Sequence, residues 1–165
     1  MKIRLAGFEP ESVVDGPGIR FVIFTQGCPH FCAGCHNPQT HNPFAGEEYE
    51  IDIIKEEITA AKGITGITIS GGEPFLQPEA LSELVDHAKS IGLHVVVYSG
   101  YIYEDLLILG QQNPSIINVL EKADILIDGP FIKAERDISL AFRGSRNQRI
   151  IDLNKTRSQG YIVTL

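Results

Sequence analysis

Short apolar runs alternate along this chain with segments of helical periodicity, and this alternation limits the folds open to it. The runs are rich in valine and isoleucine, and the strand candidates are residues 19–26, 66–70, 93–99 and 125–128. Nearly continuous apolar runs of this length are typical of strands covered on both faces. Because such strands alternate with helices, the sequence predicts a parallel α/β sheet.

The segments between these runs predict helices that cover the sheet. Apolar residues recur every three or four positions in residues 51–61 and 81–91, which is the spacing of one helical face. Pro78 stands near the start of the second helix, and Asn113 is the expected cap of a third helix around residues 116–120. In parallel sheets, ligand-binding residues gather in the loops after the carboxyl ends of the strands.

Composition is that of an ordinary globular protein. The chain has 165 residues, of which 43% are hydrophobic and 21% charged, which suits a single domain, residues 1–165, with a real core. No apolar run approaches the roughly 20 residues needed to cross a bilayer, and residues 1–5 hold no signal-peptide core. We therefore expect a cytoplasmic protein with no membrane association. The net charge of −7 disfavours binding to nucleic acid.

All three cysteines fall in the loop after the first predicted strand. Cys28, Cys32 and Cys35 have the spacing Cys-x3-Cys-x2-Cys. An odd, clustered set in a reducing compartment argues against a disulfide framework. Three thiolates on one short loop can hold three irons of a cubane cluster and leave the fourth iron open to an outside ligand. An open coordination position distinguishes a catalytic metal site from a closed structural one.

Two other interpretations of the cysteines stay open at this point. His30 or His36 could supply a fourth ligand and complete a structural zinc site, which would make the chain a zinc-stabilised binding module. The cysteines could also form a redox thiol set or be plain buried residues.

A second unusual loop, Ser-Gly-Gly-Glu-Pro at residues 70–74, follows the second predicted strand. Gly71 and Gly72 let backbone groups approach a ligand without a Cβ in the way. Glu73 adds a carboxylate suited to an ammonium group. No Walker lysine and no Gly-x-Gly-x-x-Gly pattern occur, so phosphate binding is not indicated. The loop could also be only a strand-to-helix turn, but the cysteines before it favour an amino-acid-type ligand.

Together the two loops resemble the radical S-adenosylmethionine (SAM) superfamily. The resemblance implies a 4Fe-4S cluster held by Cys28, Cys32 and Cys35, with S-adenosyl-L-methionine chelated at the open iron. The cofactor-binding residues that it implies are Gly34, Cys35, His36, Gly71, Gly72 and Glu73. It also implies an incomplete (βα) barrel of the radical SAM type, with about five or six mostly parallel strands and helices on the outside. A closed eight-stranded barrel typically needs ~250 residues.

Further segments resemble the activases of glycyl-radical enzymes. Residues 15–20 read Asp-Gly-Pro-Gly-Ile-Arg, and residues 127–131 and 142–149 are similar to activases of anaerobic ribonucleoside-triphosphate reductase. This resemblance implies an enzyme that cleaves SAM reductively and installs a glycyl radical in that reductase, with a flavodoxin-like electron donor. The alternatives within the same chemistry are an activase of another glycyl-radical enzyme, such as pyruvate formate-lyase, and a radical enzyme acting on a small molecule.

Four further residues have two interpretations each. Many superfamily members carry an aromatic residue where Gly34 stands, so Tyr98 and Tyr101 are candidates for stacking on adenine, or else core and rim aromatics. Asp128 either orients a ligand or belongs to a turn or cap. Arg143, with its basic neighbours, either docks an acidic partner or belongs to a solvated face.

Overall fold

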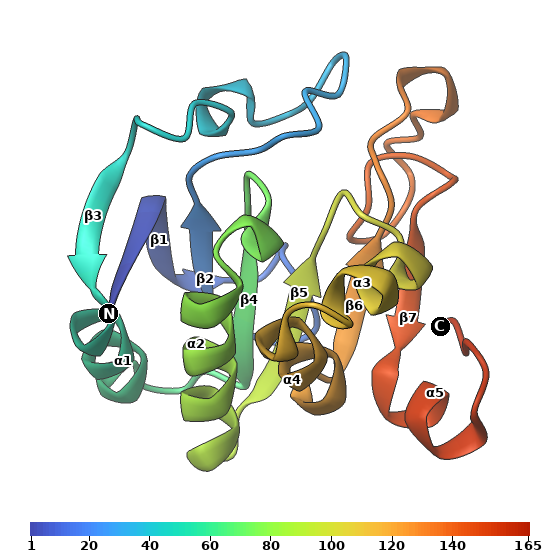
Figure 1. The fold of residues 1–165 in the computed structure, drawn as a ribbon. Coiled ribbons are helices and arrows are strands. Elements are labelled where there is room, and N and C mark those ends of the chain that lie inside the picture. The colour runs from blue at the N-terminus through green and yellow to red at the C-terminus, as the bar shows by residue number, and fades with distance from the viewer.

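The computed structural model describes residues 1–165, and its centre is a seven-stranded sheet (Figure 1). The strands are β1 (Lys2–Ser12), β2 (Arg20–Thr25), β3 (Glu47–Glu50), β4 (Gly66–Gly71), β5 (His94–Tyr98), β6 (Ile125–Asp128) and β7 (Arg149–Asp152). Their order across the sheet is β3-β1-β2-β4-β5-β6-β7. The four central strands β2, β4, β5 and β6 are parallel. The outer strands β1, β3 and β7 pair antiparallel.

Helices pack on one face of this sheet and enclose the main core. The α-helices are α1 (Ile51–Ala60), α2 (Pro78–Ser90), α3 (Tyr103–Gly110), α4 (Pro114–Lys122) and α5 (Leu153–Gln159). Three short 3-10 helices are Pro38–Thr40, Pro74–Leu76 and Lys133–Glu135. In Figure 1, α1, α2 and α4 lie on the viewer's side of the sheet. Their apolar faces and the facing strand residues form one cluster of 25 buried side chains. None of the helices has the length and apolar character that a membrane crossing requires.

The structure confirms the four predicted strands as β2, β4, β5 and β6, and the three predicted helices as α1, α2 and α4. Pro78 begins α2. The side chain of Asn113 accepts a hydrogen bond from the Ser115 N–H at 3.0 Å, which is the expected cap of α4. Residues 161–165 form no strand, and only an isolated bridge joins Thr164 to Ile151.

The fold class, an open α/β barrel with parallel central strands, is confirmed. The edge strands β3 and β7 do not pair with each other, so the sheet does not close. It has seven strands where five or six were expected, because β1, β3 and β7 carry no continuous apolar run. The strand β3, for example, reads Glu-Glu-Tyr-Glu.

The segment 13–18 folds over the sheet face opposite the helices. The Thr68 hydroxyl donates to the Asp15 carbonyl at 2.7 Å. The buried Arg20 guanidinium donates to four oxygens, those of the Thr68 hydroxyl and three backbone carbonyls, and forms no ion pair. Burial lowers the pKa of Arg20 to about 10,. The Asp-Gly-Pro-Gly-Ile-Arg motif therefore covers part of the sheet face that the helices leave open.

Candidate cluster and ligand site

A cavity of about 460 Å³ opens at the carboxyl ends of the central strands. Its walls come from the loops after β2, β4, β5 and β6. The predicted site residues that line it are Cys28, Cys32, Cys35, His36, Gly71 and Gly72. Gly34 and Glu73 do not line it. Strand ends of a parallel sheet thus bring together two motifs that lie far apart in the sequence.

The cysteine loop is anchored at its two ends. The Gly27 N–H donates to the Thr40 carbonyl at 2.7 Å, and the Cys28 N–H donates to the His41 carbonyl at 3.1 Å. The Gln26 side-chain amide donates to two further carbonyls of the returning segment. The three thiols are free and partly buried, and burial raises the pKa of Cys28,. A metal bound by Cys28 would have to displace this proton, because the thiolate is the ligand form.

The donor set fits an iron–sulfur cluster better than a single zinc ion. Three thiolates without a fourth protein ligand match a cubane with one open iron. His30, one of the two histidines that could complete a zinc site, is hydrogen-bonded to Glu73 instead.

The paired glycines bring the Gly-Gly loop, residues 70–74, into contact with the cysteine loop that follows β2. An added Cβ on Gly71 would lie 2.3 Å from the Thr25 nitrogen, and Gly71 has φ +104°, which favours glycine. The Gly72 N–H donates to Thr25 and the Glu73 N–H donates to Gly27, at 2.9 and 2.8 Å. The Gly72 carbonyl accepts no hydrogen bond within the protein, so it is free to receive a donor on a ligand.

Glu73 is fully buried and hydrogen-bonded within the protein. Its carboxylate accepts from the N–H groups of Phe75 and Gly100, from the Ser99 hydroxyl and from His30. These bonds fill the roughly four acceptor positions of a carboxylate. A direct contact of this carboxylate with a ligand stays a prediction, and its buried bonds favour a role inside the protein.

Aromatic side chains form part of the cavity wall. Tyr98 lines it, and its hydroxyl donates to the Phe142 carbonyl. Burial raises the pKa of Tyr98,. Tyr101 does not line the cavity and packs edge-on against His30. Sequence reasoning missed Phe131, which also lines the cavity and packs 5.2 Å from the His36 ring; its place in the 127–131 motif was the available signal.

The remaining wall is the arm between β6 and β7, residues 129–148. The Gln148 side chain accepts from the Gly144 N–H at 2.9 Å and donates to the Gly129 carbonyl at 3.0 Å. Arg143 donates to the Gln148 carbonyl at 2.7 Å, and its buried Nε has no partner. Arg143 is the only lysine or arginine that lines the cavity, so it is not simply part of a solvated face.

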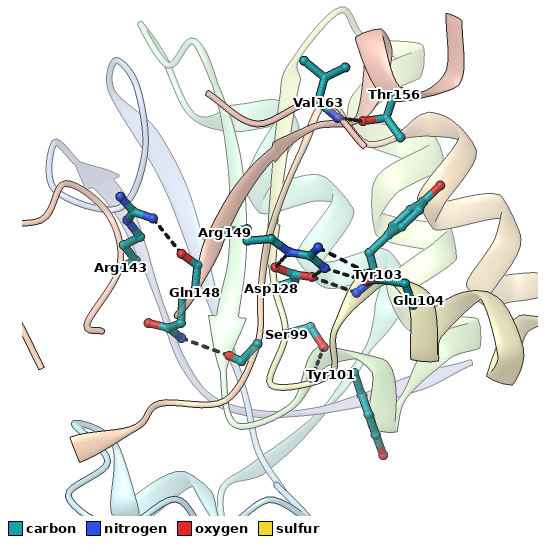
Figure 2. A network of polar contacts seen from close by, with 11 residues as sticks. Ser99, Tyr101, Tyr103, Glu104, Asp128, Arg143, Gln148, Arg149, Thr156 and Val163 are labelled. Carbon is teal, nitrogen blue, oxygen red and sulfur yellow. Dashed lines mark hydrogen bonds and ion pairs between the residues drawn. The ribbon is translucent and has the colours of Figure 1, made fainter. Parts of the chain in front are cut away.

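Asp128 lies outside the cavity and is a structural residue. Its buried carboxylate accepts from the Tyr103 N–H, at the start of α3, and from the Arg149 guanidinium (Figure 2). Arg149 also pairs with Glu104. The hydrogen bond with Asp128 is the main cause that raises the pKa of Arg149. Of the two interpretations of Asp128, the helix-capping one agrees with these contacts.

Comparison with known proteins assigns the chain to a domain family and then to a family of activating proteins. Residues 14–151 match the family model of a 4Fe-4S single cluster domain, so the chain belongs to the proteins that carry one such cluster. The anaerobic ribonucleoside-triphosphate reductase-activating protein of Salmonella typhimurium is 31% identical over 156 residues, which cover 88% of this chain and 96% of that protein. The chain belongs to this family of activating proteins, and the resemblance inferred from its motifs is confirmed.

Two other likenesses are more limited. The pyruvate formate-lyase-activating enzyme of Clostridium pasteurianum is 39% identical over 106 residues, which cover 61% of this chain and 44% of that enzyme. The crystal structure of QueE from Escherichia coli aligns with 61% of this chain and 53% of its own, with a TM-score of 0.45 and 16% identity. The fold assignment above rests on strand order and direction instead.

Proposed function

We propose that this chain is a radical SAM activating enzyme, acting as one domain over residues 1–165, which generates a glycyl radical in anaerobic ribonucleoside-triphosphate reductase. One observation carries the proposal. Three cysteine thiols and the Gly-Gly loop share a single cavity, in a chain that belongs to the family of activating proteins. A cavity of about 460 Å³ is within the usual range for a small-molecule site.

Cys28, Cys32 and Cys35 would hold the 4Fe-4S cluster. When bound and reduced, the cluster supplies the electron for reductive cleavage of S-adenosylmethionine, the chemistry that hydrogen abstraction from a partner glycine requires. The protein's own task is to place the ligand and to exclude water and stray hydrogen donors. The Tyr98 hydroxyl already donates to the Phe142 carbonyl of the arm. Tyr98 therefore offers no free O–H to the cavity.

The ligand would lie across the Gly-Gly loop. The free Gly72 carbonyl is an acceptor for the ammonium group of the methionine moiety, and Gly71 leaves room for its approach,. Gly34 and His36 are the proposed contacts on the adenosine side, and Cys35 between them is proposed to contact the cofactor as a cluster ligand. Glu73 is proposed to order the loop. Arg143 is available for an anionic group of the ligand or the partner.

The open sheet suits access by another protein, because the cavity is bounded by loops and not by a closed ring of strands. In the proposed reaction the partner is the reductase and the electron donor is a flavodoxin-like protein, and both meet the chain in the cytoplasm. Pyruvate formate-lyase is the second candidate partner, because an activating enzyme of that protein is 39% identical over part of the chain.

Anaerobic purification tests the chemistry. We expect brown protein with about four irons per chain, and 5′-deoxyadenosine only when SAM and a reductant are both present. The reduced protein is then mixed separately with the reductase and with pyruvate formate-lyase. A glycyl radical signal by electron paramagnetic resonance should appear in the reductase, and a signal only in pyruvate formate-lyase would reassign the partner. Colourless protein with one zinc ion and no product would overturn the proposal.

A further inference from the structure

The Glu73 carboxylate joins three loops that leave three neighbouring parallel strands. Glu73 itself belongs to the loop after β4. In the loop after β5, the Gly100 N–H and the Ser99 hydroxyl donate to it at 2.7 and 2.9 Å. In the cysteine loop after β2, the His30 Nε2 lies 2.8 Å from its Oε2. Because a carboxylate only accepts, this His30 nitrogen carries the hydrogen.

His30 is held firmly in this position. Its side chain is 16% exposed and packs edge-on against Tyr101, with ring centroids 4.5 Å apart. Gly100 also lies against the ring, and an added Cβ there would be 2.4 Å from the His30 Cδ2. The pocket for the imidazole is therefore built from the loop after β5, and a larger residue at position 100 would fill it.

In the middle of the cysteine loop, His30 is also the only residue with a hydrogen bond to a distant part of the chain. The hydrogen bonds that fix the loop to the rest of the chain start at Gly27 and Cys28. Among residues 29–34, His30 alone makes a hydrogen bond to another loop. The segment that carries Cys28 and Cys32 is thus held against the Gly-Gly loop at two points, by the backbone hydrogen bond from Glu73 to Gly27 at its start and by the side-chain contact of His30 with Glu73 in its middle.

We infer that His30 is a positioning residue for the proposed reaction. It sets the cysteine loop against Glu73, and so fixes where an open iron stands relative to Gly72 before ligand binds. The inference rests on the proposed function. His30 acts here through Glu73. Preorganisation of this kind matters because reacting groups displaced by about 1 Å lose much of their rate.

Two variants of the full chain, reconstituted with its cluster without oxygen, test the inference. In His30→Gln the side-chain amide keeps an N–H donor for Glu73, whereas His30→Ala removes it. We expect both variants to hold the native iron content, because the cysteines are unchanged. We expect His30→Ala to bind SAM about tenfold more weakly, the effect of losing one hydrogen bond to a charged group. His30→Gln should stay within about threefold of the native affinity.

A spectroscopic measurement separates positioning from general stability. The resonance spectrum of the reduced cluster should change less on SAM addition in His30→Ala than in the native protein, and should recover in His30→Gln. His87→Ala is the matched control. The side chain of His87, in α2, also makes one 2.8 Å contact, with Thr59 in α1, and neither helix carries a residue of the proposed site. Native affinity and a native spectral response in His30→Ala would show that the inference is wrong. If the unchanged protein takes up no cluster or no SAM, the proposed function fails instead.

A second measurement covers the case in which His30→Ala loses its cluster. In cluster-free protein, amide hydrogen exchange at Cys28 and Cys35, whose N–H groups are the hydrogen-bonded ones of residues 28–35, reports the order of this segment,. We expect exchange there to be about tenfold faster in His30→Ala, with native rates in His30→Gln and His87→Ala. Unchanged exchange in His30→Ala would overturn the inference without reference to any bound group.

Discussion

Gly72 and Gly27 lie backbone against backbone, at a distance that excludes any side chain on Gly72. An added Cβ would stand 2.3 Å from the Gly27 carbonyl oxygen and 2.9 Å from that of Thr40. The same Gly27 oxygen accepts the N–H of Glu73. The Gly-Gly loop and the start of the cysteine loop are therefore in direct backbone contact, and this contact depends on the missing Cβ.

Gly72→Ala should force these two loops apart. We expect a cost of about 2 kcal/mol in the free energy of unfolding, typical of an overpacked site. That cost lowers the melting temperature of a chain this size by roughly 4–8 °C, and SAM binding should weaken with it. Thermal unfolding followed by circular dichroism measures the change. Gly7→Ala is the control, because nothing lies within 4 Å of its added Cβ; equal melting temperatures for the two variants would contradict the prediction.

Each of Cys28→Ala, Cys32→Ala and Cys35→Ala should abolish cluster retention and SAM cleavage. The thiols lie in a loop outside the main core, so the sheet should stay folded. Iron and sulfide analysis measures retention, and far-ultraviolet circular dichroism checks the fold. If any one of these variants still cleaved SAM at the native rate, the assignment of the three cysteines as cluster ligands would be wrong.

Glu73→Gln should destabilise the chain even without a cluster. The N–H groups of Phe75 and Gly100 now donate to the two carboxylate oxygens. In glutamine an amide nitrogen replaces one of these oxygens, and it cannot accept the bond. Leaving such buried donors unsatisfied costs about 2–4 kcal/mol. Urea unfolding of the cluster-free protein gives the difference. Glu121→Gln, at an exposed position of α4, should stay within about 0.5 kcal/mol of the native value. If both variants match the native protein, the Glu73 network is not stabilising.

Glu104 provides a pH-dependent test of the β7 edge. The hydrogen bond from Arg149 holds the pKa of Glu104 below its ordinary value of 4.5. A lowered pKa in the folded state stabilises the fold above pH 4.5, and this contribution is lost as pH falls through the lowered value. The native protein should therefore exceed Glu104→Gln in stability by roughly 0.5 kcal/mol at pH 7. The difference should vanish in strong acid. Urea titrations from pH 7 to 3 measure it, and a constant difference would contradict the assignment.

The central strands could be predicted because they are covered on both faces. Residues such as Ile67 and Val96 face opposite sides of the sheet and are both fully buried, which leaves a continuous apolar run in the sequence. The strand β1 buries Ile3 and Leu5 between exposed or half-exposed neighbours, and its pairing with β2 is interrupted by register shifts. Its pattern is therefore too broken to be distinguished from a loop.

The helix α3 was missed for the opposite reason. Its apolar residues are consecutive, and only Leu106 of the run 106–109 is buried, so no helical period is visible. In the site, the cysteine and Gly-Gly motifs were recognisable because each follows a strand. The bonds of Glu73 to His30 and Ser99 could not be foreseen, since they join positions 43 and 26 residues apart. Such pairs depend on tertiary structure, which no local pattern encodes.

An unclosed sheet leaves two free edges, and each is protected from adding a strand of another molecule. At one edge, three of the four residues of β3 are glutamates, whose like charges repel a second copy of the same edge. At the other, the segment ending at Leu165 folds against β7, bonding to both Ile150 and Asp152. Growth of the sheet from chain to chain, and the aggregation that follows from it, is thereby disfavoured at both ends. The half-barrel can thus stay open to a partner without the aggregation hazard that open sheets carry.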